Sequence, residues 1–227
     1  MTPVLALDCA VTGLGVAVVR AGDCLARLRE EGRDQAARLL PAIGETLAAA
    51  GIGRRDIGLI AITVGPGSFT GVRVGLAAAR GLAVALELPL AGIATTDVLL
   101  AQAPALTTSG ARNRLVVAAI DSRLGDWFCA LDDGDRRPFI ASASQLAERL
   151  AGRPATIVGP DVERLAAALP GAVAAQGPID PLALARLASQ VDLSEWRERN
   201  RRNGLPRPLY LRGVNVTSPD GTRRTVG

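Results

Sequence analysis

The sequence contains no histidine and no lysine, and all 26 of its basic residues are arginine. Without histidine, the commonest general base and metal ligand is missing. Without lysine, the chain has neither the lysine of a P-loop nor a Schiff-base nucleophile. These two absences argue against a histidine-ligated metallopeptidase and exclude a P-loop nucleotide hydrolase.

Aromatic residues are also rare, at 3% of the chain, so the core must be built from Ala, Val, Leu and Ile, which favours α/β layers. Three cysteines, Cys9, Cys24 and Cys129, show no paired spacing, and we therefore expect neither disulfides nor a zinc site. No uninterrupted apolar run approaches the roughly 20 residues that span a bilayer. The start of the chain has no basic segment before its apolar run, so we expect no signal peptide and a cytoplasmic protein with no membrane contact.

Apolar runs and amphipathic segments alternate along the 227 residues, enough for one large or two small domains. Two halves of similar order follow one another, each opening with a strand that ends in aspartate, Asp8 and Asp121. This order predicts an internal duplication of a βββαβα-like unit. In the first half we expect strands at 4–9, 15–21, 24–32, 59–65 and 90–96, and helices at 34–51, 70–87 and up to about residue 102. In the second half we expect strands at 114–123, 126–133, 136–143 and 155–160, and helices at 142–152, 161–169 and 180–191.

Charge is distributed unevenly between the two ends of the chain. Residues 1–110 carry nine arginines and nine acids, whereas residues 196–224 hold eight arginines against Glu198 and Asp220. A solvated tail explains such a run, and an anion-binding arm that faces RNA or an acidic partner is the alternative. Only Trp196 and Tyr210 could stack on bases in this region, so base-specific recognition is not expected.

The stretch "ITVGPGSFTGVRVG" from Ile62 to Gly75 has the order strand, glycine turn and helix that often binds phosphate. It lacks the glycine-lysine-serine or -threonine triplet of a Walker A loop. It also lacks the glycine spacing and the downstream acid of a dinucleotide fingerprint. Two interpretations remain: a tight turn for close packing, or an anion site at the helix start with Gly67, Ser68 and Thr70 as candidate contacts.

Small residues recur every fourth position along the helix that follows. Gly67, Gly71, Gly75, Ala79 and Ala83 form this stripe, at a cost in helix propensity of about 1 kcal/mol per glycine. Such a stripe allows another backbone to approach closely, and a helix so apolar needs cover on more than one side. A second helix layer of the same chain or a partner protein could provide that cover.

The two strand-end carboxylates, Asp8 and Asp121, could face a cleft between the halves, where paired carboxylates position a metal or a water. Hydrogen bonding to the following loop is the simpler interpretation and the one we prefer, because no histidine, lysine or carboxylate cluster accompanies them. We assign no catalytic and no metal-ligating residue.

Four segments together carry a resemblance to a known family. "VLALDCA", "GPGSFTGVRVG", "AAIDSRLGDWF" and "RPLYLRG" occur in this order between Val4 and about Arg212. The chain thereby resembles the bacterial TsaB (YeaZ) family of tRNA threonylcarbamoyladenosine biosynthesis proteins, which are non-catalytic paralogues of TsaD. "GPGSFTGVR" is the most specific of the four segments.

The resemblance implies two tandem actin-like subdomains (ribonuclease-H-like, ASKHA), with boundaries at 1–105 and 112–212 and a flexible basic tail at 213–227. It implies an assembly subunit without chemistry of its own. This subunit would bind TsaD, with the ATPase TsaE, for threonylcarbamoyl transfer to adenosine 37 of tRNAs that read ANN codons. The complex would use ATP while this chain alone binds no cofactor, tRNA would bind through the complex, and a homodimer could occupy the same surface. The partner surface is expected on Gly71, Arg73, Val74, Gly75, Ala78, Ala79 and Leu82.

Some positions depart from the family pattern. Cys9 replaces the usual threonine after Asp8, Gln35 stands where histidine is common, and Phe128 stands where tyrosine is usual. These departures weaken any catalytic role for Asp8 or Gln35. The alternative function is a nucleotide-binding enzyme of the actin-like ATPase superfamily. It would need a glycine-rich turn directly after Asp8, yet the first glycines come at 13 and 15.

Overall fold

The computed structural model describes residues 2–32, 34–107, 114–212, 214–217 and 223–226. Two five-stranded mixed sheets form its framework. The first has the order β3-β2-β1-β4-β5 and comprises β1 (Val4–Asp8), β2 (Leu14–Arg20), β3 (Asp23–Glu30), β4 (Leu59–Thr63) and β5 (Leu90–Ile93). The second has the order β8-β7-β6-β9-β10 and comprises β6 (Leu115–Asp121), β7 (Trp127–Leu131), β8 (Phe139–Ala141), β9 (Ala155–Gly159) and β10 (Ala172–Gln176).

The two sheets have the same topology when the second is numbered from β6. In each, the first three strands form an antiparallel meander, and the last two add in parallel to the opposite side of the first strand. The helices also occur in corresponding places, as α1 (Gln35–Ala49), α2 (Phe69–Ala85) and α3 (Thr95–Leu106), then α4 (Ala143–Leu150), α5 (Glu163–Ala167) and α6 (Pro181–Ala188). The predicted duplication and the two-subdomain α/β fold are confirmed.

Local sequence explains where several helices begin. The Ser68 hydroxyl accepts a hydrogen bond from the Gly71 amide at 3.2 Å and caps α2. A reciprocal pair between Ser142 and Gln145 starts α4, with the Ser142 hydroxyl as its cap. In α6, Asp180 caps the helix and Pro181 occupies its first turn.

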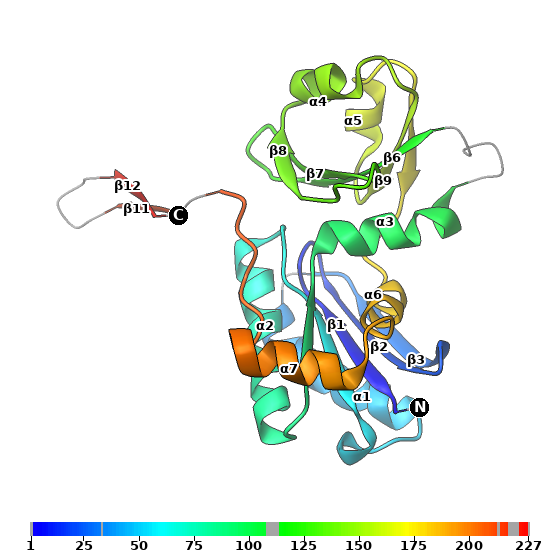
Figure 1. Cartoon of the computed structure of the whole chain (residues 1–227), viewed down its shortest axis with the longest axis vertical. Coiled ribbons are helices and arrows are strands. Elements are labelled where there is room, and N and C mark those ends of the chain that lie inside the picture. Colours follow the sequence, from blue (N-terminus) through cyan, green and yellow to red (C-terminus); the bar gives the residue numbers. More distant parts are fainter. Residues whose placement is uncertain (1, 33, 108–113, 213, 218–222, 227) are drawn as a thin grey trace.

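Alternating side chains divide the first subdomain into two apolar layers. In β1, Leu5 and Leu7 pack with α1 and α2 on the outer face, whereas Val4 and Ala6 pack with α6 on the inner face. A further core lies between the second sheet and helices α4 and α5. Figure 1 shows α3 and α6 between the two sheets, where they contact each other.

The last helices do not follow the expected division at residue 112. Helix α3 packs on the second sheet, whereas α6 packs on the first sheet and α7 (Leu193–Asn203) packs at its β5 edge. The exchange buries the inner face of each sheet under a helix from the other half. Residues 181–203 therefore belong structurally to the first subdomain.

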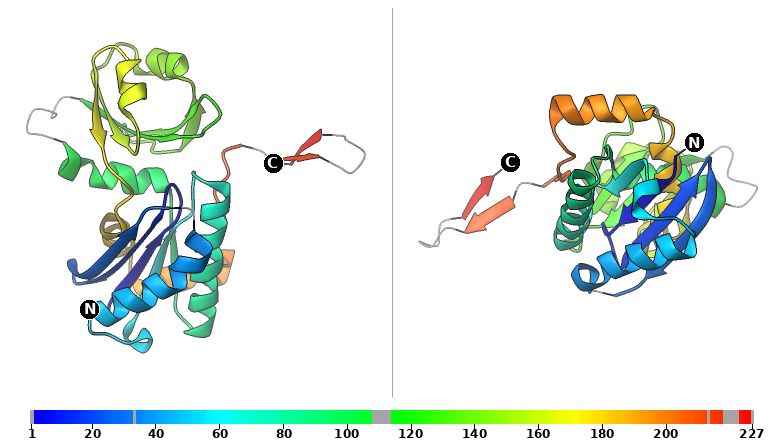
Figure 2. Two further views of the ribbon diagram at one scale, coloured as in Figure 1. Left: turned by 180° about the vertical axis from the view of Figure 1, so that it is seen from behind. Right: turned by 90° about the horizontal axis from the view of Figure 1, so that it is seen from below.

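Beyond α7, the extended segment 204–212 runs along the first subdomain toward the second (Figures 1 and 2). In the predicted tail, β11 (Val214–Thr217) and β12 (Arg223–Val226) pair antiparallel, and this hairpin stands away from both subdomains (Figure 1). The rest of the tail, and residues 108–113 between the two halves, lie outside the described residues. Among the described helices, none is both long and apolar enough to cross a bilayer.

Candidate partner-binding face and inter-subdomain cleft

The stripe of small residues on α2 faces the sheet of its own subdomain. A Cβ added at Gly71 would lie 2.0 Å from the Cys9 carbonyl oxygen, and one at Gly75 would lie 3.1 Å from Ile62 Cδ1. Ala79 is fully buried. The expectation that Gly71, Gly75 and Ala79 contact a partner is therefore corrected: these residues let α2 lie directly on β1 and β4.

The opposite side of α2 is open. Arg73 is exposed, and Val74, Ala78 and Leu82 are partly exposed, so these four expected partner residues remain candidates. Next to them lies a row that the sequence analysis did not single out. It consists of Ala77, Gly81 and Val84, and Val84 is 69% exposed.

Helix α1 continues this apolar surface, because it lies beside α2 on the same face of the sheet (Figure 2). Its outward residues include Leu40, 58% exposed, together with Pro41, Gly44 and Ala48. We call the surface formed by residues 40, 41, 44, 48, 77, 81 and 84 the outer face. No described residue covers it, and the side chains that form it carry no charge.

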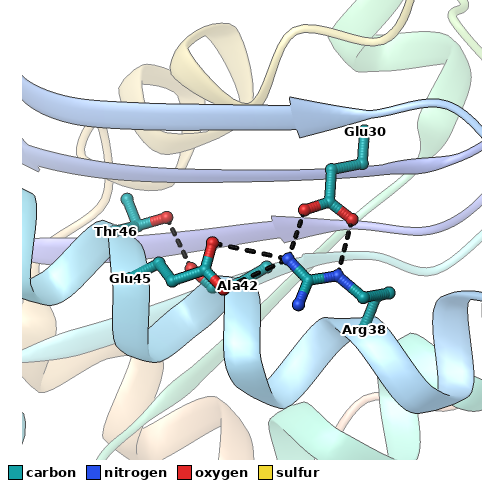
Figure 3. Close-up of polar contacts among 5 residues, drawn as sticks. All are labelled: Glu30, Arg38, Ala42, Glu45 and Thr46. Carbon is teal, nitrogen blue, oxygen red and sulfur yellow. Dashed lines mark hydrogen bonds and ion pairs between the residues drawn. The ribbon is translucent and has the colours of Figure 1, made fainter.

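Arg38 holds α1, one of the two helices that form the outer face, against the first sheet. Figure 3 shows Arg38 of α1 between Glu30 of β3 and Glu45, which lies two turns further along α1. Arg38 donates from Nε to Glu30 Oε2 at 2.9 Å and from a terminal nitrogen to both carboxylates. The hydrogen bond from Arg38 lowers the pKa of the Glu30 carboxyl. This pairing ties α1 to the edge strand of the sheet.

A cleft opens between the subdomains at the N-terminus of α2, with a cavity volume of about 340 Å³. Gly67 and Ser68 line it, and Thr70 lines a neighbouring cavity of about 540 Å³ that Gln35 and Arg123 also reach. The three candidate anion contacts therefore border two adjoining cavities. The opposite wall carries Leu124 and Phe128 of the second subdomain.

Both strand-end carboxylates take part in local hydrogen bonds. Asp8 is buried, and its Oδ1 accepts hydrogen bonds from Thr63 Oγ1 at 2.6 Å and from the Ala10 amide at 3.1 Å. Burial raises the pKa of Asp8. Asp121 accepts from the Arg123 amide at 2.7 Å and from Arg164 at 3.2 Å. Local hydrogen bonding, the preferred interpretation, is confirmed for both residues, and Asp121 also lines the cleft between the subdomains.

The described part of the chain holds no group of three or more His, Cys, Asp or Glu side chains that could bind a metal. Two of the thiols are also unsuited to chemistry. Burial raises the pKa of Cys129 to about 12 and also raises that of Cys9.

Segment 204–212 lies in the arginine-rich region that was expected to be a solvated tail or an anion-binding arm, but its place at the cleft was not predicted. Leu209 donates its amide to the Val64 carbonyl at 2.7 Å, and Arg73 donates to the Tyr210 hydroxyl at 2.8 Å. Arg212 pairs with Asp126 of the second subdomain. The segment thus contacts both walls of the cleft. Its prolines and single apolar residues show no helix or strand period, so the sequence pattern did not predict these contacts.

Comparison with known proteins agrees with the fold. The chain matches the structure of YeaZ from Pseudomonas aeruginosa with a TM-score of 0.70 and 26% identity, over 93% of this chain and 100% of the other. A component of (R)-2-hydroxyglutaryl-CoA dehydratase from Acidaminococcus fermentans shares the fold alone, with a TM-score of 0.52 and 9% identity. These matches define a protein of the two-subdomain actin-like class.

Sequence comparison identifies the family within this class. The family profile described as "TsaD: tRNA N6-adenosine threonylcarbamoyltransferase" matches residues 29–187, more than half of the chain. The protein named tRNA threonylcarbamoyladenosine biosynthesis protein TsaB is 37% identical over 127 residues in Escherichia coli and 40% identical over 122 residues in Haemophilus influenzae. These matches cover 56% and 54% of this chain and 53% and 50% of the relatives, so the matched part spans about half the length of the curated relatives. The chain belongs to the family that this profile describes, and within it the chain is similar to the TsaB (YeaZ) proteins.

Proposed function

We propose that this chain is a non-catalytic subunit in tRNA threonylcarbamoyladenosine biosynthesis, and that it binds TsaD through the outer face of α1 and α2. The observation that carries the proposal is that face itself. Two neighbouring helices expose uncharged residues, Leu40 and Val84 among them, that no described residue covers. Exposed apolar surface of this kind marks protein–protein interfaces. Its small residues, such as Gly44 and Gly81, would let partner helices approach closely.

The absence of histidine and lysine and the locally bonded Asp8 and Asp121 support a subunit without chemistry of its own. TsaD would then transfer the threonylcarbamoyl group to adenosine 37 of the tRNA. As the family resemblance implies, TsaE joins the complex and the complex uses ATP, while this chain binds no cofactor alone. A homodimer is the competing occupant of the same face.

A charge placed on the outer face tests the proposal. Ala77→Glu should abolish co-purification with TsaD of the same organism, because a carboxylate would be buried without a partner in the interface. The isolated variant should unfold as the parent does, since Ala77 is exposed. Ala167→Glu, an exposed position on α5 of the other subdomain, is the matched control and should retain TsaD.

Modification of tRNA by the reconstituted complex should fall with the same variant and not with the control. If Ala77→Glu retained TsaD and supported modification, the outer face would not be the partner site. Turnover of ATP by the purified chain alone would contradict the non-catalytic role and favour the actin-like ATPase alternative.

A further inference from the structure

We infer that α7 and segment 204–212 form an RNA-binding surface that holds the phosphate backbone of the tRNA against the complex. The inference rests on the proposed function in one respect: it takes tRNA to be the substrate of the complex. It adds which face of this chain the RNA contacts, and by which groups.

The net charge of the whole chain is located on this surface. Residues 193–212 hold six of the 26 arginines and two of the 22 acids, so the remaining 20 arginines and 20 acids cancel and the formal charge of +4 belongs to these 20 residues. A neutral body with one compact positive region attracts a polyanion in a defined orientation.

Five of the six arginines of this region are exposed, and the sixth, Arg212, is partly buried against Asp126. Arg197 and Arg207 are exposed and form no ion pair with any described residue. Arg199, Arg201 and Arg202 pair with Glu195 or Glu198 on the helix surface. Exposed pairs of this type are weak, about 0–1 kcal/mol each, so phosphates can compete for these guanidinium groups.

The positive surface leads to a pair of exposed aromatic rings. Segment 204–212 passes along α2, where Arg80 donates to the Pro206 carbonyl at 2.9 Å. At its end the rings of Tyr210 and Phe69 lie 5.6 Å apart, 39% and 45% exposed, at the rim of the cleft. Arg73 lies over the Phe69 ring, 3.6 Å from its centre. Rings beside arginines are what unpaired nucleotides stack on.

These features favour RNA over other anionic partners. The exposed residues of α7 are Ser, Glu, Arg and Asn, with no exposed apolar side chain that could enter a lipid headgroup layer. An acidic protein would gain nothing from the exposed rings at the cleft rim. At 1.5 Å per residue, the 11-residue helix is about 16 Å long, enough to follow several phosphates of one strand.

The test measures tRNA binding by the complex of this chain with TsaD as a function of salt. The test variant replaces Arg197, Arg201, Arg202 and Arg207 with glutamine. The control variant replaces Arg136, Arg137, Arg149 and Arg153, four exposed arginines of the second subdomain, in the same way. Both variants lose the same formal charge.

The test variant should bind tRNA at least tenfold more weakly at physiological salt. Its slope of log affinity against log salt should fall by about 3, at roughly 0.7–0.9 for each of the four lost phosphate contacts. The control variant should show the same slope as the parent complex, with a difference of less than about half the change that one lost phosphate contact would cause. Equal loss in both variants would mean that only net charge matters, and an unchanged slope would mean that α7 does not touch RNA; either result overturns the inference.

Two further measurements distinguish RNA binding by this surface from binding of TsaD and from attraction by charge alone. The test variant should still co-purify with TsaD; if it did not, the arginines would bind that protein rather than RNA. Tyr210→Ala should weaken binding of a single-stranded oligonucleotide about tenfold with little change in salt slope, whereas Tyr210→Phe, which keeps the ring, should not. Loss of tRNA binding with TsaD retained leaves the proposed function intact, and loss of TsaD in the Ala77→Glu variant leaves the RNA surface intact.

Discussion

Gly71 marks the point where α2 comes closest to the end of β1. Its missing side chain would otherwise lie 2.0 Å from the Cys9 carbonyl oxygen, a backbone atom that cannot move without its strand. We expect Gly71→Ala to lower the free energy of unfolding by about 2–4 kcal/mol, because the helix must shift to relieve the overlap. Urea unfolding of the purified chain measures this.

Gly81 on the same helix is the matched control. It is exposed, and a Cβ there meets no atom within 4 Å. Gly81→Ala should therefore stabilise the chain by about 0.5–1 kcal/mol through helix propensity alone. If both alanine variants changed stability alike, close packing would not be the reason for glycine at position 71.

The same residues show what a sequence can predict at this scale. The period of four correctly predicted a close backbone approach along α2, but the period does not say which backbone approaches. The local bonding of Asp8 could be predicted because a strand-end aspartate without charged neighbours finds amides in the next loop. The exposed row of Ala77, Gly81 and Val84 carries no signal of its own, since small apolar residues also fill helix interiors.

Helix α7 depends on one side chain for its position on the first sheet. Asn200 imitates a further strand beside β5: its Oδ1 accepts from the Leu90 amide at 2.7 Å, and its Nδ2 donates to the Leu90 carbonyl at 3.0 Å. Asn200→Ala should lower the free energy of unfolding by about 1–3 kcal/mol, because both partly buried backbone groups lose their partner. Thermal or urea unfolding gives the value.

Asn203→Ala, at an exposed position of the same helix, should change stability by less than about 0.5 kcal/mol. Similar effects in the two variants would show that α7 is held by Trp196 and its apolar neighbours alone. A large effect confined to Asn200 would show that the RNA-binding surface has a fixed orientation on the subdomain.

Two of the elements that sequence analysis missed, β10 and α7, share a physical cause. Strand β10 is an edge strand of small, largely exposed residues, and α7 buries only Trp196, so neither shows the period of a half-buried element. Helix α3 continues to Leu106 across Pro104, although a helix end near Gln102 was expected, because the proline removes only one intrahelical hydrogen bond close to the end of the helix. Strands β1–β9 and helices α1, α2, α4, α5 and α6 carry clear apolar patterns and were predicted.

At the scale of the whole molecule, the two halves exchange a helix. One apolar cluster contains Ala6 and Ala17 of the first sheet, Ala118 and Ile120 of the second, and Leu99 of α3, with α6 residues among them. Local sequence could not predict this, because a helix buries the same apolar face whichever sheet covers it. The two halves therefore share a core, and neither half alone would bury the inner face of its sheet from solvent.

The shared core predicts that both subdomains unfold in one transition. The two tryptophans are independent probes, since Trp127 lies in β7 of the second sheet and Trp196 lies in α7 on the first subdomain. In the single-tryptophan variants Trp127→Phe and Trp196→Phe, each fluorescence signal should give the midpoint that circular dichroism gives for the same variant.

The Arg212–Asp126 pair adds a second link across the cleft, and Asp126→Asn should lower both midpoints together. A fluorescence midpoint that departs from circular dichroism in either variant would show that the subdomains unfold separately, and that the exchanged helices do not couple the partner-binding subdomain to the second sheet.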